Sequence, residues 1–163
     1  MEKIKDLLII GGDSRQLYMA DHLEERGFNI AVYGLPERAR KGVTELKSAV
    51  EAADAVILPL PVTRDGRYVF SIVPVKETFD EMAAMFHKDQ PIFAGMLSHS
   101  MRARLEKRCD EVYDYFERED VTVMNSVPTA QGILKTMLEN IEYTVHSSKC
   151  AVFGYGRVGK GKG

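Results

Sequence analysis

The glycines near the end of the chain have the spacing of a phosphate-binding turn. Gly154, Gly156 and Gly159 form a G-x-G-x-x-G pattern, with Arg157 between the second and third glycine. This pattern binds the pyrophosphate of a dinucleotide when a strand precedes it, a helix follows it and an acidic residue comes about twenty residues later. The apolar run 150–153 predicts the strand, but the 163-residue chain ends soon after Gly159. The predicted dinucleotide site is therefore incomplete.

A second candidate site follows the first predicted strand, in the sequence GGDSRQ at residues 11–16. One interpretation is a tight turn into a helix whose N-terminus is capped by Asp13. The other keeps this turn and adds Arg15, because a helix N-terminus and a guanidinium together bind a carboxylate well. Both interpretations place a helix start here, and the second predicts an anion site.

The segment Asn125-Ser126-Val127-Pro128-Thr129 has two potential N-caps and a proline in what we expect to be the first helical turn. It either initiates a helix and does nothing more, or places Asn125, Ser126 and Thr129 in a cleft between two domains. In the second case these polar groups would bind the substrate.

One histidine is a candidate for proton transfer. His99 comes shortly after a predicted strand and lies beside Ser98, whereas His22 and His87 lie within predicted helices and His146 at the end of one. The sequence shows no Ser-His-Asp order, no Cys-His pair and no metal-ligand cluster. We therefore expect neither nucleophilic catalysis nor a metal site.

The elements that position these loops alternate regularly between strand and helix. The strands are short and apolar on both sides, as in a parallel sheet covered by helices on both faces. We predict a doubly wound α/β domain, flavodoxin-like or Rossmann-like, followed by a long interdomain helix. Asp65-Gly66 predicts a hairpin excursion after the third strand. The predicted strands are 5–10, 28–33, 55–60, 91–94, 110–113, 121–124 and 149–153, and the predicted helices are 16–26, 44–53, 78–87, 98–108 and 128–145.

These elements suggest three parts of the chain. We expect residues 1–127 to form an N-terminal substrate-side α/β domain and residues 128–146 an interdomain helix. Residues 147–163 would then be the first strand and glycine turn of a dinucleotide-binding domain. We expect the chain to end just inside that second domain.

The composition excludes several classes of protein. The formal net charge is −2, so the chain has no basic excess with which to bind nucleic acid. It contains no run of eighteen or more apolar residues and no signal peptide, which argues against a membrane protein. Cys109 and Cys150 lie far apart, and we expect both to be reduced thiols in a cytoplasm.

Taken together, the motifs resemble the A subunits of dipicolinate synthase, the sporulation enzyme of endospore-forming bacteria. The resemblance covers residues 6–159 and rests on four motifs that occur in one order. They are GGDSRQ, MNSVPTAQG, the step His146-Ser147-Ser148, and FGYGRVG.

This resemblance implies a longer enzyme with a Rossmann domain that binds NADP or NAD. The architecture is similar to that of 2-hydroxyacid and alanine dehydrogenases, with the active site between two domains. The implied reaction is oxidation of a dihydrodipicolinate-type precursor to dipicolinate in the mother-cell cytoplasm. The implied partners are the flavoprotein-like B subunit of the same enzyme and further copies of the chain.

The resemblance also implies roles for the candidate residues. Arg15, Ser98, Ser126 and Thr129 would bind the dicarboxylate substrate, with His99 as acid or base and Asn125 orienting the ring. Gly154, Gly156, Arg157 and Gly159 would contact the cofactor. Two features depart from the family pattern: Gln131 replaces an acidic residue, and the loop LPLPVTRDG differs from the type expected. The alternative is a non-catalytic α/β binding or regulatory module.

Overall fold

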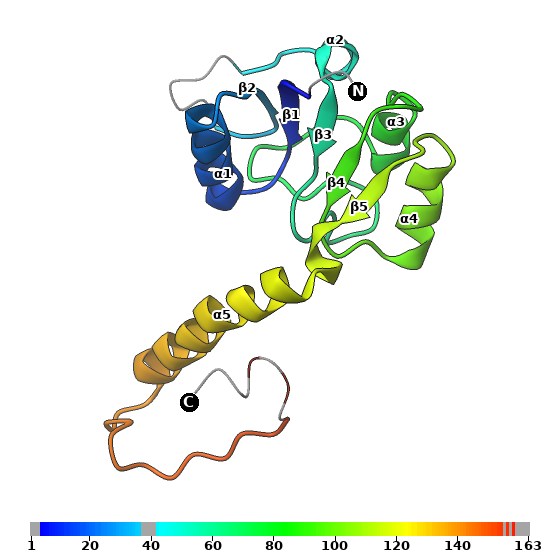
Figure 1. Ribbon diagram of the computed structural model, residues 1–163. Coiled ribbons are helices and arrows are strands. Elements are labelled where there is room, and N and C mark those ends of the chain that lie inside the picture. Colours follow the sequence, from blue (N-terminus) through cyan, green and yellow to red (C-terminus); the bar gives the residue numbers. More distant parts are fainter. Residues whose placement is uncertain (1–3, 37–41, 155, 157, 159–163) are drawn as a thin grey trace. The chain divides into compact units, whose positions relative to one another are not determined.

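The computed structural model describes residues 4–36, 42–154, 156 and 158. The chain divides into two compact units, Met1–Tyr115 and Phe116–Gly163. The first unit contains a sheet with its helices, and the second contains one long helix and the segment that follows it (Figure 1).

The sheet of the first unit has five strands, and all of its pairs are parallel. The strand order is β2-β1-β3-β4-β5, so β1 lies between β2 and β3. Along this sheet the order of connections reverses between β1 and β3, and such a switch point is where ligands bind in doubly wound folds. The predicted fold class is confirmed. The strands are Asp6–Ile10 (β1), Asn29–Tyr33 (β2), Ala55–Ile57 (β3), Ile92–Ala94 (β4) and Val112–Asp114 (β5).

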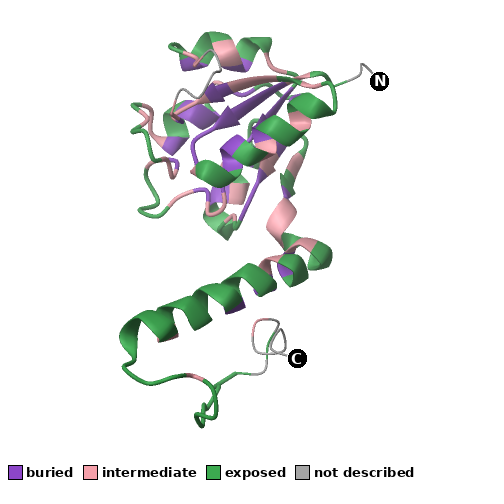
Figure 2. Ribbon diagram, turned by 90° about the vertical axis from the view of Figure 1, so that its left-hand side faces the viewer, coloured by how far each residue is buried: buried purple, intermediate pink, exposed green. Residues whose placement is uncertain are grey.

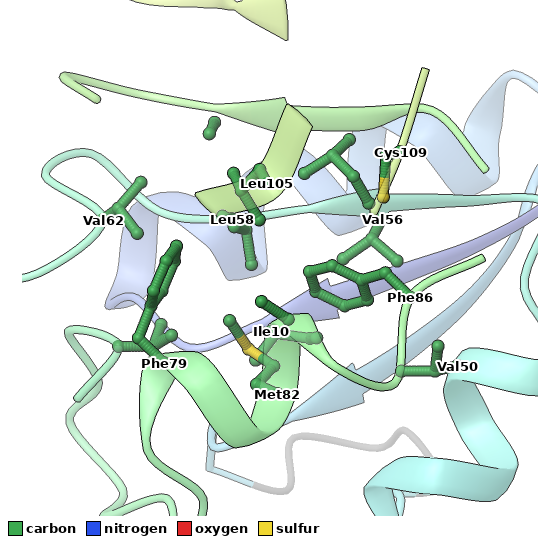
Figure 3. Close-up of a cluster of buried hydrophobic side chains, with 14 of the residues drawn as sticks. Ile10, Val50, Val56, Leu58, Val62, Phe79, Met82, Phe86, Leu105 and Cys109 are labelled. Atoms are coloured by element: carbon green, nitrogen blue, oxygen red, sulfur yellow. The ribbon is translucent and has the colours of Figure 1, made fainter. Parts of the chain in front are cut away.

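Helices cover both faces of this sheet because the strands are apolar on both sides. On one face, Ile9 and Ile57 pack with Leu17 and Ala20 of α1 (Ser14–Glu25). On the other face, the helices α2 (Leu46–Ala52), α3 (Phe79–Ala83) and α4 (His99–Glu106) contribute to a larger apolar cluster (Figure 3). The strands are buried between these layers (Figure 2).

Side-chain caps set the start of three of these helices. Asp13 caps α1, Thr78 caps α3 and Ser98 caps α4. The predicted cap at Asp13 is therefore confirmed. The helices α2, α3 and α4 are a few residues shorter than their apolar patterns predict.

The second unit differs from the prediction in three places. Its helix α5 spans Glu119–Asn140, so the strand predicted at 121–124 and the helix bounds 128–146 are wrong. Glu119 and Asp120 lie in the first turn, where acidic side chains stabilise the helix dipole, and cooperative helix growth overrides the β-branched residues that suggested a strand. The described segment 149–153 contains no strand, because no neighbouring strand of its unit pairs with it.

The hairpin predicted at Asp65-Gly66 is only partly present. The Asp65 carboxylate accepts the N–H groups of Arg67 and Tyr68, which makes a tight turn. The Phe70 N–H donates to the Val62 carbonyl at 2.8 Å, but the described residues on either side of the turn form no strands. Within the described part of the chain, no helix combines the length and apolar character of a membrane span.

Candidate functional site

The candidate site of the first unit lies at the switch point between β1 and β3. Gly11, Gly12 and Asp13 follow β1, and the segment up to Leu60 follows β3. The Arg15 side chain joins these two loops, because its Nη2 donates a hydrogen bond to the Leu60 carbonyl at 2.8 Å. The structure thus places Arg15 at the edge of the sheet where a doubly wound fold binds its ligand.

Asp13 orients this guanidinium and also starts α1. Its Oδ1 accepts the backbone N–H of Arg15 at 2.9 Å, and the Gln16 Oε1 accepts the Asp13 N–H at 2.9 Å. The same carboxylate accepts two bonds from the Arg15 guanidinium, Nε to Oδ1 at 3.0 Å and Nη2 to Oδ2 at 3.0 Å. Arg15 is therefore held in one orientation by two parallel hydrogen bonds.

This pair is ionised at neutral pH and open to a ligand. The hydrogen bond from Arg15 holds the pKa of Asp13 below its ordinary value of 3.8, and the same bond raises the pKa of Arg15. The side chain of Arg15 is 54% exposed and that of Asp13 is 25% exposed. More than half of the guanidinium side chain is accessible, so Arg15 can bind an anion without first leaving Asp13.

Tyr115, the last residue of the first unit, is the uncharged group near this pair. Its hydroxyl donates to the Leu58 carbonyl at 3.1 Å, and burial raises its pKa to about 12. The hydroxyl is therefore protonated at neutral pH. The positive charge of Arg15 acts against this and lowers the pKa of Tyr115, but burial has the larger effect.

Ser98 and His99 lie at the start of α4, after β4. The Ser98 Oγ accepts the Met101 N–H at 3.3 Å and lies 3.1 Å from the Ser100 Oγ, so this hydroxyl caps the helix. His99 is the first residue of α4 and is exposed. The roles of Ser98 in substrate binding and of His99 in proton transfer stay predictions.

The other predicted residues line a cavity of about 700 Å³ within the second unit. Asn125, Ser126 and Thr129 contribute one wall from α5, and Gly154 and Gly156 contribute to another. The structure thus brings together five residues that the sequence assigned to substrate and cofactor. Arg157 and Gly159 lie outside the described residues.

The predicted N-caps of this segment are wrong. Residues 125–129 lie inside α5, with Pro128 also inside the helix, and not at its start. The Ser126 Oγ donates to the Val123 carbonyl at 2.6 Å, and the Thr129 Oγ1 donates to the Asn125 carbonyl at 2.8 Å. These hydroxyls bond backward along the helix, as serine and threonine do when they lie in a helix interior.

The sequence motifs do not identify the groups around Arg15. The Leu60 carbonyl and Tyr115 belong to none of these motifs. Only the topology could have predicted these neighbours, because the loops after the first and third strands meet at the switch point of a doubly wound sheet. Among the described residues, no three His, Cys, Asp or Glu side chains are grouped to hold a metal ion.

Comparisons with known proteins agree on one family. Residues 6–116 match the family model for the N-terminal domain of the dipicolinate synthase A subunit. The A subunit of dipicolinate synthase from Bacillus subtilis (strain 168) is 27% identical over 165 residues, which cover 94% of this chain and 54% of that protein.

Two solved structures have the same fold as this chain. The crystal structure of the dipicolinate synthase A subunit from Bacillus halodurans has a TM-score of 0.73 and 25% identity, covering 96% of this chain and 56% of that one. The corresponding structure from Bacillus subtilis has a TM-score of 0.72 and 26% identity, covering 98% and 56%. The chain thus spans about half the length of these relatives. Since the family match runs from β1 to the end of the first unit, the chain belongs to the family of N-terminal domains of dipicolinate synthase A subunits.

Proposed function

We propose that this chain is the substrate-side part of a dipicolinate synthase, and that its first unit binds one carboxylate of a pyridine-type dicarboxylate. The observation that carries this proposal is the position of Arg15. Its guanidinium is held by Asp13 and Leu60 at the switch point, and its side chain is 54% exposed. With Nε and Nη2 already bonded to Asp13 and Leu60, the Nη1 N–H groups of this ordered guanidinium remain to donate charge-assisted hydrogen bonds to a carboxylate.

The reaction of the whole protein would oxidise a dihydrodipicolinate-type precursor to dipicolinate. The ring loses a hydride and a proton as it becomes aromatic. This chain would contribute binding and orientation, which bring the reacting atoms together. In this proposal Arg15 and Ser98 bind the substrate from the first unit, and His99 accepts the proton.

The second unit carries further residues that we propose to contact the substrate. Ser126 and Thr129 bind the substrate, and Asn125 orients its ring. Support comes from the cavity of the second unit, which all three residues line. Their side chains share one side of α5, and so they can contact one ligand.

The hydride would pass to a nicotinamide dinucleotide, NADP or NAD, which supplies the redox chemistry when it is bound. Gly154 and Gly156 line a cavity, but a phosphate-binding turn also needs a strand before it, and the described residues 149–153 form none. The described residues of this chain therefore do not fit the dinucleotide by themselves. We expect this chain alone to have no dehydrogenase activity.

The word subunit in the family name and the surface of α5 support a proposal about partners. We propose that the protein works as a homo-oligomer and together with a flavoprotein-like B subunit in the mother-cell cytoplasm during sporulation. Most of the α5 ribbon is exposed (Figure 2). Met124, Val127 and Leu138 of this helix are between 50% and 75% exposed. Apolar side chains gathered on an exposed helix are typical of a surface that binds another chain.

The proposal is tested by calorimetric titration of this chain with dipicolinate. Arg15→Ala should weaken binding by about tenfold or more, because a hydrogen bond to a charged group contributes about 1.5–3 kcal/mol. Arg108→Ala is the matched control, since Arg108 is exposed just beyond the C-terminal end of α4 and away from the switch point. It should leave the affinity unchanged.

Two results would contradict this proposal. The first is wild-type chain that does not bind dipicolinate, which would favour the binding or regulatory module. The second is equal affinity of the wild-type chain and Arg15→Ala, which would place the ligand away from the switch point.

A further inference from the structure

The segment after β3 lies against the loop that carries Asp13. The Gly12 N–H donates to the Phe70 carbonyl at 2.7 Å, and the Ile72 N–H donates to the Gly12 carbonyl at 3.0 Å. Gly12 immediately precedes Asp13 in the chain. Two backbone hydrogen bonds therefore fix residues 70–72 beside the start of α1.

The same segment carries Arg64, which stacks on Phe70. Its guanidinium carbon lies 3.9 Å from the centre of the Phe70 ring, whose backbone is bonded to Gly12. Arg64 is exposed, and no carboxylate of the described residues forms an ion pair with it. Its guanidinium therefore stacks on a residue whose backbone is bonded to Gly12, and it has no negatively charged partner among those residues.

The charges of the site support the same placement. The hydrogen bond from Arg15 is the main reason for the low pKa of Asp13, and the positive charge of Arg64 lowers this pKa further. The positive charges of two guanidinium groups therefore both act on the Asp13 carboxylate. Such a group of charges has an excess positive charge, which favours an anionic ligand.

We propose that Arg64 is a second anion-binding residue of this site and that it selects ligands with two carboxylates over ligands with one. The inference rests on the proposed function, in which Arg15 binds the first carboxylate. Arg64 binds the second carboxylate by leaving the face of Phe70. Exposed cation–π contacts are weak, whereas bidentate bonds between arginine and carboxylate are strong, so the exchange favours the ligand.

The test compares two ligands that differ by one carboxylate, dipicolinate and picolinate, by calorimetric titration of this chain. Arg64→Ala should lower the affinity for dipicolinate by about tenfold or more, because it removes a charged hydrogen-bonding partner. Its affinity for picolinate should change by less than about twofold, because picolinate needs only Arg15. Arg64→Lys keeps the charge but not the planar fork, and should fall between these results for dipicolinate.

Arg67→Ala is the matched control for position and charge. Arg67 lies three residues further along the same segment, and its guanidinium carbon is 5.3 Å from the centre of the Tyr68 ring. This variant should leave both affinities unchanged. Because Arg64 is exposed, Arg64→Ala should unfold at the same temperature as the wild-type chain. If Arg64→Ala unfolds at a lower temperature, the affinities of Arg64→Lys for the two ligands test the inference instead.

The outcomes separate this inference from the proposed function. If dipicolinate binds the wild-type chain and Arg64→Ala leaves that affinity unchanged, the inference is wrong while the proposed function stands. If Arg64→Ala lowers the affinities for dipicolinate and picolinate equally, Arg64 acts through its charge alone and does not bind the second carboxylate. That result also overturns the inference. If the wild-type chain binds no dipicolinate, the proposed function fails and this inference fails with it.

Discussion

Two polar segments, residues 11–16 and residues 125–129, carry side chains that can cap a helix, but only the first segment caps one. Asp13 precedes α1, and its carboxylate accepts the backbone N–H of Arg15. Ser126 and Thr129 lie inside α5, and their hydroxyls donate to the carbonyls of Val123 and Asn125. The first segment starts a helix and leaves a guanidinium available, whereas the second continues a helix and places its side chains along one wall of a cavity.

What precedes each segment explains the difference. Gly11 and Gly12 have φ values of 68° and 100°, so the backbone before Asp13 cannot be helical. Gly11 also donates to the Tyr33 carbonyl, which ties it to β2. Nothing comparable stops α5 between Glu119 and Asn125, and the helix continues through the segment. The start of a helix therefore depends on the residues before the cap as much as on the cap.

The largest effect should come from disturbing the first segment at Gly11. A Cβ added there would lie 2.6 Å from the Phe70 carbonyl oxygen and 2.7 Å from Val69 Cγ1. We expect Gly11→Ala to lower the free energy of unfolding by about 3–4 kcal/mol, because a left-handed backbone costs an L-residue about 1–2 kcal/mol and overpacking adds about 1–3 kcal/mol. Urea denaturation measures this change.

Two other glycines serve as controls for this comparison. Gly27 has a φ of 88° but no atom within 4 Å of an added Cβ, so Gly27→Ala should show only the backbone cost of about 1–2 kcal/mol. Gly132 lies inside α5 with no atom within 4 Å, so Gly132→Ala should stabilise that helix by about 0.5–1 kcal/mol. Equal losses for Gly11→Ala and Gly27→Ala would show that the segment around Phe70 does not hold the first loop.

The next largest effect is expected for Pro128→Ala, a substitution that tests whether residues 125–129 lie inside a helix. A proline inside a helix removes the hydrogen bond to the carbonyl four residues earlier, which here belongs to Met124. Pro128→Ala should therefore stabilise α5 by up to about 3 kcal/mol. Far-UV circular dichroism should show more helix.

A proline outside any helix provides the control for this change. Pro74 is exposed and lies in the irregular segment before α3, so Pro74→Ala should leave the helix content unchanged. If Pro128→Ala also leaves the helix content unchanged or lowers it, Pro128 is at a helix start, and the second segment then resembles the first.

The sequence predicts the first unit well because its signals are local and agree with one another. The runs around Ile9, Val32 and Val56 are apolar on both sides and end at turns, so they predict buried parallel strands that the structure confirms. The cap at Asp13 is predicted for the same reason. The bounds of α5 are not predicted, because Val121, Thr122 and Val123 favour a strand locally and only cooperative helix growth decides against it.

The candidate site is only partly predictable for a related reason. Arg15 can be found from the sequence because it follows a strand and a cap. Its contact with the Leu60 carbonyl depends on which strands are neighbours in the sheet. The strand order is a property of the packed sheet, and no single loop sequence contains it.

The smallest effect concerns the charge of Asp13 and should depend on pH. The folded pKa of Asp13 is lowered below its ordinary value of 3.8, so the ion pair with Arg15 stabilises the fold above that pH. This stabilisation is lost as the pH falls through the lowered pKa. Asp13→Asn keeps a good cap but removes the charge, so it should lower the free energy of unfolding by at most about 1 kcal/mol near neutral pH.

Urea denaturation at about pH 7 and about pH 3 separates the charge from the cap. The difference between the wild-type chain and Asp13→Asn should shrink at the lower pH, because protonation of the wild-type carboxyl removes the same ion pair. Asp13→Ala should lower the free energy of unfolding by about 1 kcal/mol more than Asp13→Asn at both pH values, since it also removes the cap.

Ser126→Ala is the corresponding substitution in α5. It should not lower the free energy of unfolding at either pH, because alanine is the better residue in a helix interior. A difference for Asp13→Asn that is equally large at both pH values would mean that the Asp13 charge does not stabilise the first segment, and the two segments would then differ only in the position of their helices.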